Sequence, residues 1–364
     1  MKKKILIIGG GIHGISCAMS LSALDCEIML IEKNNGLFLG TSGSTHNRAH
    51  MGYHYPRADG TVKECLDGLK VFQKMFKDIF IYPNGNYYML SKTGSMTTDA
   101  QFEVFCKKNR LPYELAWPAK HFLKRDGLSS SFLVPEMIFD VSKLIRRIRN
   151  YIKHKNIIIK NNTELLKGRK KNNGSFHFTV SENGEKKEYT CDIVVNATYA
   201  FANNILKAFG LEQHMKRYLL QIVEVAVVRS RDKIPGLTIM DGPFISIMPY
   251  GNNPDLFLVY DVENSVNMQE EGYLLNDAIK IKSNWKKMKR KGQIFFPFMN
   301  DLEYVDSLRA FRPIPLVDDT RDRSTKIRTY DDCRCFYSIL EGKFISALLM
   351  AEKLKNLIVS HTFI

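Results

Sequence analysis

The stretch KKKILIIGGGIHGISCAMSLSALDCEIMLIEKN, residues 2–34, predicts the fold of the first part of the chain. A continuous apolar run at residues 4–8 is typical of a strand that is covered on both faces. Gly9-x-Gly11-x-x-Gly14 follows at once, then apolar residues at helical spacing, and then a second strand that ends in Glu32. This order of strand, glycine-rich turn, helix, strand and acid predicts a βαβ unit that binds a dinucleotide.

Each part of this unit has a task in nucleotide binding. Gly9 permits the tight turn, Gly11 lets the backbone approach a pyrophosphate, and Gly14 lets the helix pack against the strand. The first amides of the helix face the phosphates, and Glu32 can accept hydrogen bonds from ribose hydroxyls. The predicted cofactor-binding residues of this unit are Gly9, Gly11, Ile12, His13, Gly14, Glu32 and Lys33. One alternative is a glycine-rich turn in another α/β protein; the other, an export signal, needs a longer apolar run.

The chain has 364 residues, enough for two domains, and a formal net charge of +15. Basic residues gather at 143–155 and 282–291, where solvated helix faces are the simplest interpretation. The functional alternatives are attraction of anionic substrates, acidic membrane surfaces or nucleic acid. No nucleic-acid motif accompanies the charge, so we expect no nucleic-acid partner.

The seven cysteines form no regular framework of pairs, which is typical of a reducing compartment. Cys333 and Cys335 lack a second pair at zinc-site spacing, so we expect no metal. No stretch of the sequence approaches the length of a membrane span. We therefore expect a cytoplasmic protein, and the basic surface leaves open a peripheral contact with the inner face of the membrane.

Elements of α/β character return after residue 140, far from the opening unit. Residues 139–168 predict a helix capped by Asp140 and then a strand, and residues 174–191 predict a hairpin around Asn183-Gly184. Strand-like stretches at 221–229 and 256–260 lie in the intervening sequence. This alternation predicts an α/β fold in which a discontinuous Rossmann-like domain is interrupted by a second, mainly antiparallel β-sheet domain. The predicted boundaries are 1–80, 139–214 and 301–364 for the nucleotide-binding domain, and 81–138 and 215–300 for the substrate domain.

A second glycine-rich stretch, GTSGSTHNRAHMGYHYP at residues 40–56, carries a family resemblance. It resembles the second flavin-binding motif of the D-amino-acid-oxidase superfamily of FAD enzymes. It is especially similar to this stretch in flavin-linked glycerol-3-phosphate and L-2-hydroxyglutarate dehydrogenases. Residues 192–206 resemble the strand and turn that pass near the FAD. Residues 311–319 and 336–354 resemble the C-terminal region, where an Arg-Pro pair reaches the substrate and a Gly-Lys turn opens the last helix.

Three positions depart from the family pattern. Tyr199 stands where the family usually has glycine, so we expect the loop after that strand to run differently. His54 stands where the glycerol-3-phosphate enzymes have an arginine that helps bind phosphate. Glu341 stands where the family has the second glycine of the Gly-Lys turn. The resemblance does not clearly cover residues 60–135 or 215–300, which would shape the substrate pocket.

The resemblance implies roles for particular residues. FAD is the expected cofactor, and its further binding residues are Thr41, Ser42, Ser44, Ala197, Thr198, Gly342, Lys343 and Phe344. His50 or His54 is expected to remove a proton from the substrate. Arg312 can hold a carboxylate or phosphate, unless it forms a structural salt bridge with an acid such as Asp318. Arg48, Tyr55, Tyr250 and Tyr260 are weaker substrate candidates, with core packing as the alternative for the tyrosines.

The resemblance implies an FAD-dependent oxidoreductase that transfers a hydride from a small or medium-sized anionic substrate to flavin N5. Oxidation of a CH–OH group in a hydroxy acid, polyol phosphate or sugar derivative is the favoured reaction. An amine or amino-acid oxidase or dehydrogenase, and a non-catalytic FAD-binding protein, are the alternatives. The electron acceptor, whether oxygen, quinone or a protein, is left open.

Overall fold

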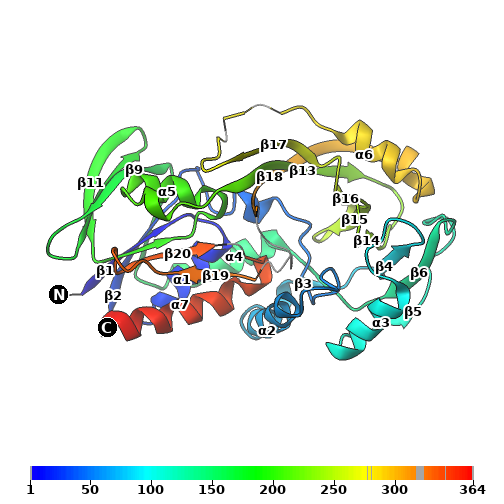
Figure 1. The fold of residues 1–364 in the computed structure, drawn as a ribbon, viewed down its shortest axis with the longest axis horizontal. Helices are drawn as coiled ribbons and strands as arrows, with labels where there is room; N and C mark the ends of the chain where they lie inside the picture. The colour runs from blue at the N-terminus through cyan, green and yellow to red at the C-terminus, as the bar shows by residue number, and fades with distance from the viewer. Residues whose placement is uncertain (1, 277, 280, 317–323, 341, 363–364) are drawn as a thin grey trace.

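The protein consists of two β-sheet lobes that lie side by side, as the ribbon in Figure 1 shows. The computed structural model describes residues 2–276, 278–279, 281–316, 324–340 and 342–362. The chain crosses between the lobes several times, so that each lobe is built from segments far apart in the sequence. The predicted fold class, α/β with a second and mainly antiparallel sheet, is confirmed.

The first lobe is built on a parallel sheet. In the described residues its strand order is β19 (Lys326–Arg328), β20 (Phe336–Leu340), β12 (Ile193–Asn196), β1 (Lys3–Ile8), β2 (Cys26–Ile31) and β8 (Ile157–Lys160). Only β19 pairs antiparallel, with β20. Ile5 and Ile7 of β1 pack on one face, and Leu6 and Ile8 pack on the other. The continuous apolar run predicted this burial on both faces.

Helices cover one face of this parallel sheet, and a small sheet covers the other. The helices are α1 (Ile12–Leu21), α2 (Asp59–Met75), α4 (Val141–Ile152) and α7 (Ala347–Thr362). The opposite face packs on β9 (Thr163–Lys170), β10 (Phe176–Glu182), β11 (Glu185–Cys191) and α5 (Ala202–Ala208). Asn183 and Gly184 both have positive φ in the turn between β10 and β11, as a two-residue hairpin turn requires. The Asp140 side chain caps α4 by accepting the Lys143 N–H at 2.8 Å.

The second lobe is a large, mainly antiparallel sheet. Its described strands are β4 (Asn86–Ser91), β5 (Glu114–Leu115), β6 (Leu128–Leu133), β13 (Tyr218–Arg229), β14 (Gly236–Met240), β15 (Ile245–Tyr250), β16 (Asn253–Asp261), β17 (Val266–Gly272) and β18 (Glu303–Pro315). One face is covered by α6 (Trp285–Gly292) and the aromatic segment that follows it. The helix α3 (Asp99–Lys108) packs near β4 and β6, and a short ribbon of β3 (Phe80–Ile81) and β7 (Ile138–Phe139) lies apart from the large sheet.

The pairing of β18 changes one predicted boundary. We placed residues 301–364 with the nucleotide-binding lobe, but β18 pairs along nearly the whole of β13 in the antiparallel sheet. We therefore propose that the last segment of the first lobe begins after Pro315.

Candidate active site

The glycine-rich turn between β1 and α1 is packed too closely to accept side chains. Gly9 has φ +108°, and a Cβ there would lie 2.8 Å from the carbonyl oxygen of Ala197. A Cβ on Gly14 would lie 1.9 Å from the carbonyl oxygen of Gly9. A Cβ on Gly11 would meet the hydroxyl of Ser42 at 2.9 Å. The loop, β12 and α1 therefore approach one another as closely as a dinucleotide fold requires.

Glu32 closes this turn from the end of β2. Its Oε2 accepts the Gly10 N–H at 2.7 Å, and its Oε1 accepts the backbone and side-chain N–H groups of Asn34 at 2.8 and 2.6 Å. The carboxylate is therefore fixed beside the glycine turn, where the ribose of a dinucleotide would lie. The neighbouring Lys33 points elsewhere, with Nζ 4.1 Å from the ring centroid of Phe201.

The amino end of α1 has the features of a cofactor site. The Ile12 N–H donates to Ser42 Oγ at 3.0 Å, while the next amides of a helix have no partner within the helix. His13 follows Ile12, and both of its ring nitrogens are buried without a well-formed hydrogen bond in the described structure. Burial lowers the pKa of His13 to about 4, against a smaller opposing effect of the Lys343 backbone. Open helix amides and an unpaired imidazole fit a phosphate-bearing cofactor such as FAD.

The segment after Gly40 ties the two lobes together. The Thr41 hydroxyl donates to the Phe311 carbonyl at 3.2 Å and accepts the Phe311 N–H at 3.1 Å. The Ser44 N–H closes a short 3-10 turn by donating to the Thr41 carbonyl at 3.1 Å. The hydroxyls of Thr41 and Ser42, which we predicted to face the cofactor, thus have protein partners that hold this segment between β18 and α1. Their contact with the cofactor stays a prediction.

The end of β12 supports the glycine turn from the other side. The Ala197 carbonyl lies against Gly9, and the Thr198 hydroxyl donates to Asn196 Oδ1 at 2.7 Å. Tyr199 has φ +54°, in the left-handed region that favours glycine. The tyrosine thus adopts a backbone conformation that glycine adopts readily, and the different course expected of this loop stays a prediction.

The turn before the last helix lies against the amino end of α1. A Cβ on Gly342 would lie 2.6 Å from Nε2 of His13, so a larger residue would displace that ring. The Lys343 side chain is buried, and its Nζ lies 4.2 Å from the ring centroid of Tyr55. Phe344 packs on Phe139, with ring centroids 4.9 Å apart. The predicted last helix starts at Ala347, after a 3-10 turn over Phe344–Ser346. Glu341 is outside the described residues.

One face of the antiparallel sheet carries a row of polar side chains, most of them buried. Direct cross-strand pairing joins Tyr88 to Thr238, Thr238 to Ser246, and Ser246 to Tyr260. Direct partners point to the same face of a sheet. His46 lies over this row, with its Nδ1 3.4 Å from Ser246 Oγ and its ring against Tyr260. We call Tyr88, Thr238, Ser246 and Tyr260 the polar row. The segment 40–56 runs across the face of the sheet that carries it.

Arg312 lies at one end of the polar row. Its Nη1 donates to the Tyr260 hydroxyl and its Nη2 donates to Gln221 Oε1, both at 2.7 Å. Its Nε is buried without a partner in the described structure. Asp318, the acid that we considered as an alternative partner, is outside the described residues. The nearby Tyr250 packs on Val225, Val227 and Leu258, and burial raises its pKa, with Asp306 adding to the effect.

Arg48 lies beneath the other end of the row and is only 5% exposed. Its guanidinium donates to the Tyr88 hydroxyl at 3.0 Å and to the Thr238 hydroxyl at 2.6 Å. Tyr88 in turn donates to Glu136 Oε2 at 2.6 Å. We predicted that Arg48 contacts substrate, but the structure places it inside the protein, where it supports this network.

His50 is the histidine that this network supports. Its Nδ1 lies 3.3 Å from Glu136 Oε1, and its side chain is 21% exposed while that of Glu136 is 0% exposed. Burial lowers the pKa of His50, and the glutamate opposes that shift. Its ring packs against the rings of His54 and Tyr55. His50 is thus neutral at physiological pH and partly open, as a proton acceptor must be.

His54 occupies a different environment from His50. The surrounding protein and the charges of Arg48, His50 and Lys343 lower its pKa well below the ordinary value. Burial is the largest of these causes, and the neighbouring charges add to it. In the described structure it has no carboxylate beside it, which separates it from His50 as a candidate base.

Glu136, Tyr88 and Gln221 are site residues that the sequence analysis missed. Glu136 stands alone in the apolar stretch SFLVPEMIF, residues 131–139, and a single acid in such a run is a signal of a buried functional carboxylate. Gln221 and Tyr88 belong to strands, and nothing in the sequence reveals which face they occupy relative to residues 40–56.

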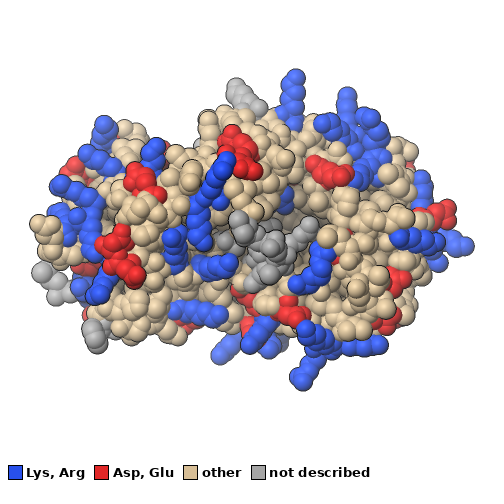
Figure 2. Space-filling view, viewed as in Figure 1, with Lys and Arg blue, Asp and Glu red and all other residues tan. Residues whose placement is uncertain are grey.

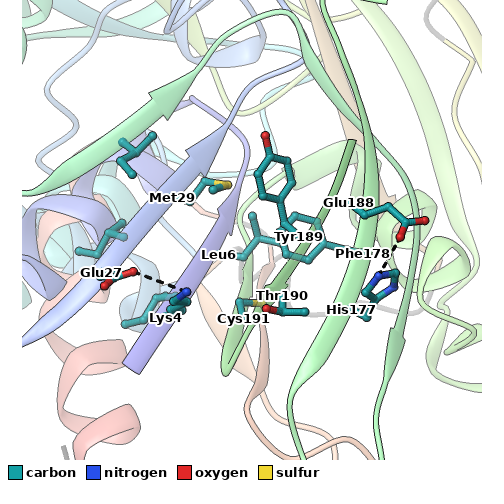
Figure 3. A pocket seen from close by; sticks show the side chains of 13 residues that line it. Lys4, Leu6, Glu27, Met29, His177, Phe178, Glu188, Tyr189, Thr190 and Cys191 are labelled. Carbon is teal, nitrogen blue, oxygen red and sulfur yellow. Dashed lines mark ion pairs between the residues drawn. The ribbon is translucent and has the colours of Figure 1, made fainter. Parts of the chain in front are cut away.

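Metal-binding clusters and membrane-spanning helices are absent from the part of the chain that the structure describes. This part holds no group of three or more side chains suited to a metal ion, and no helix long and apolar enough to cross a membrane. A cavity of about 340 Å³ opens between the start of β1 and β2 and the hairpin of β10 and β11. Figure 3 shows Lys4, Glu27, His177 and Glu188 around it, and this cavity contains none of the residues of the polar row.

Comparison with known proteins defines the class to which this site belongs. The DAO family model, described as FAD dependent oxidoreductase, matches residues 4–289. The chain therefore belongs to this family of FAD-dependent oxidoreductases, and FAD is its cofactor.

Relatives and solved structures agree with this assignment. The chain is 24% identical to the FAD-dependent monooxygenase FPY4 of Fusarium mangiferae, over 97% of this chain and 90% of that protein. It is 23% identical to the anaerobic glycerol-3-phosphate dehydrogenase subunit A1 of Haloferax volcanii, over 98% of this chain but only 64% of that subunit. The fold is similar to L-proline dehydrogenase from P. horikoshii, with a TM-score of 0.75, 17% identity, and coverage of 99% and 94% of the two chains. It is also similar to FAD-bound L-alpha-glycerophosphate oxidase from Mycoplasma pneumoniae, with a TM-score of 0.74, 15% identity, and coverage of 99% and 94%.

Proposed function

We propose that this oxidoreductase oxidises a CH–OH group of a small or medium-sized anionic substrate, such as a hydroxy acid, a polyol phosphate or a sugar derivative. Bound FAD supplies the hydride acceptor at N5 of its ring. The substrate loses its C–H and O–H bonds and gains a C=O double bond. The electron pair leaves with the hydride, and the hydroxyl proton is taken by Nε2 of His50.

The observation that carries this proposal is the pairing of Arg312. Its two Nη atoms are held by neutral oxygens, those of Tyr260 and Gln221, and not by a carboxylate of the described structure. These contacts fix the guanidinium without neutralising its charge. A guanidinium held in this way recognises a carboxylate or a phosphate through its planar face of N–H donors.

The length of the polar row supports a substrate larger than the smallest hydroxy acids. Tyr88 and Tyr260 are separated by three inter-strand steps, on the order of 14 Å. Arg312 lies at one end, and His50 lies above the other. The long side chain of Arg312 shortens the distance that a substrate must span between Arg312 and His50. A substrate that contacts both residues still needs to be about the size of a sugar.

Anaerobic reduction of the FAD-loaded protein tests the proposal. Hydroxy acids, polyol phosphates and sugar acids are added in turn, and loss of the flavin absorbance is recorded. Bleaching by an anionic alcohol, slowed by deuterium at the reacting carbon, is the expected result. Bleaching by amino acids or secondary amines alone would refute the alcohol assignment. Readmission of oxygen or a quinone analogue to the bleached protein then identifies the electron acceptor.

A pair of arginine variants tests the anion contact. Arg312→Gln is expected to raise KM for an anionic substrate by about 10- to 100-fold, because it removes a charge-assisted hydrogen bond. Arg309→Gln is the matched control on the same strand, where the guanidinium donates to the Ile281 carbonyl at 2.8 Å and is exposed. An equal effect of both substitutions would contradict the contact.

We also propose that the basic surface over α6 makes a peripheral contact with acidic membrane. Lys286, Lys287 and Arg290 are exposed on this helix, and Ile294 beyond it is 60% exposed. Figure 2 shows Lys and Arg side chains gathered at the upper right, where Figure 1 draws α6. Several cations around an apolar side chain suit the headgroup region of an anionic bilayer.

A further inference from the structure

We propose that Glu136 is a positioning residue for His50, which fixes the orientation of the imidazole and stabilises the imidazolium when His50 takes a proton. This inference rests on the proposed function of His50 as the base. Its test is arranged so that the two can fail separately.

Glu136 lies directly beside the His50 ring. Glu136 Oε1 lies 3.3 Å from Nδ1 of His50, a distance that is closer to an ion-pair contact than to a short hydrogen bond. An imidazole that presents Nδ1 to a carboxylate keeps its other nitrogen, Nε2, on the far side of the ring. The His50 side chain is 21% exposed, so its ring is partly open to solvent. With Nδ1 turned toward Glu136, Nε2 is the nitrogen left to accept a proton from a substrate.

Glu136 is buried and held by hydrogen bonds to its neighbours. Its side chain is 0% exposed, and the Tyr88 hydroxyl donates to its Oε2 at 2.6 Å. Tyr88 is held in turn by Arg48, at 3.0 Å. The Glu136 backbone is also fixed, since its carbonyl accepts the Asn86 side chain at 3.0 Å. A carboxylate held at one oxygen and left unpaired at the other is oriented for a single task, which is to face His50.

The positive charges around Glu136 offset the cost of burying its carboxylate. Burial alone would raise the pKa of Glu136, but His50, Arg48 and Tyr88 together lower it. A buried carboxylate that stays ionised needs a compensating charge, and Arg48 supplies it through Tyr88. The remaining charged and titratable groups that face His50 from the elements around it are Arg48, His46, His54, Tyr55, Tyr88 and Lys343. Glu136 is the one anion among them in the described structure.

This arrangement explains why His50 can accept a proton in a positively charged site. Arg48 and Lys343 both disfavour an imidazolium there. A carboxylate in contact with Nδ1 offsets that repulsion only when it is ionised and aimed at the ring. Removal of the carboxylate should therefore make His50 harder to protonate and leave its ring free to turn.

The primary test reads His50 without any substrate. Histidine-labelled, FAD-loaded protein is titrated by NMR, and the His50 signal is assigned by its loss in His50→Gln. Glu136→Gln is expected to lower the pKa of His50 by about one unit or more. The matched control is Glu103→Gln, because Glu103 also accepts a tyrosine hydroxyl, that of Tyr113 at 3.0 Å, but has no histidine beside it. An unchanged His50 titration in a folded Glu136→Gln protein would overturn the proposal.

The second test measures kcat and KM of the Glu136 variants, with a substrate that bleaches the flavin. Glu136→Gln should lower kcat by about 10- to 100-fold with KM within about threefold, and Glu136→Asp should restore part of the loss. A matching fall in both variants, with the wild-type pH profile retained, would mean a merely structural role. Should Glu136→Gln fail to fold, Tyr88→Phe keeps the carboxylate and frees it from one donor. The pKa of His50 should then rise, and no change would refute the coupling. If no alcohol bleaches the flavin, the proposed function fails while the NMR test still stands.

Discussion

Replacement of Gly14 by alanine should separate cofactor binding from folding. A Cβ at this position would lie 1.9 Å from the carbonyl oxygen of Gly9, whereas real Cβ contacts stay beyond 3.0 Å. The opposing atom belongs to the backbone, so no side chain can turn aside. The helix α1 and the glycine turn must therefore move apart by about 1 Å, which is the difference between these two distances.

A displacement of this size is enough to damage the phosphate site. Charge-assisted hydrogen bonds from helix amides to a phosphate act over about 2.7–2.9 Å, so a shift of about 1 Å weakens each of them. Overpacking of this kind costs about 1–3 kcal/mol, and a loss of that size in binding corresponds to a roughly 5- to 150-fold higher Kd for FAD. The assay is titration of the apoprotein with FAD, followed by quenching of flavin fluorescence.

Gly40→Ala is the control for this experiment. Gly40 also lies in a glycine-rich segment, but a Cβ there would meet nothing within 4 Å, and its φ of −91° suits alanine. Its Kd for FAD should stay within about threefold of the wild type. Circular dichroism of both apoproteins shows whether the fold survives. A folded Gly14→Ala protein that binds FAD as tightly as Gly40→Ala would refute the role assigned to this close contact.

Three further outcomes follow from other parts of the molecule. Tyr199→Gly should be more stable than Tyr199→Ala by about 1 kcal/mol in urea unfolding, because alanine carries the strain of φ +54° and glycine does not; equal stability would contradict this. Glu182 accepts Lys160 at 2.8 Å and Tyr189 at 2.7 Å, and these contacts lower its pKa to about 2 from 4.5. Since the folded pKa is depressed, its stabilisation is present above pH 4.5 and is lost as pH falls toward 2, so Glu182→Gln should destabilise the protein more at pH 7 than at pH 3. The double substitution Lys286→Gln, Lys287→Gln should reduce sedimentation with phosphatidylserine liposomes, and added salt should reduce that of the wild type; binding to neutral liposomes alone would contradict a charge-driven contact.

The local elements of the fold could be predicted because short-range physics determines them. The apolar run in β1, the glycine turn and the Asp140 cap each depend on neighbours in the sequence. The hairpin at Asn183-Gly184 is another case, because the turn needs two residues with positive φ. The place of β18 could not be predicted in this way. Its pairing with β13 joins residues about 90 positions apart, and a strand pattern does not say which sheet receives it.

The candidate site also has a part that could be predicted from neighbouring residues and a part that depends on distant ones. The cofactor turn lies within residues 9–32, so the local sequence is enough to predict it. The polar row takes one residue from each of several strands that are far apart in the sequence. Arg48 shows the limit of a motif. Its position in the second glycine-rich segment suggested a substrate contact, but strands that follow it by up to 190 residues bring Tyr88 and Thr238 around it. Partners as distant as these determine whether a side chain is buried or open.

The positive charges that we propose to attract an anionic substrate also favour the neutral form of the histidines beside them. Burial lowers the pKa of His50, and Arg48 and Lys343 lower it further. An anionic substrate held near these groups brings negative charge and should raise that pKa again. The pH profile of kcat/KM reports the free enzyme and that of kcat reports the substrate complex. The acid limb of the kcat profile should therefore lie at higher pH than the acid limb of kcat/KM. A neutral substrate analogue should shrink the difference, and coincident limbs for an anionic substrate would mean that its charge is bound away from His50.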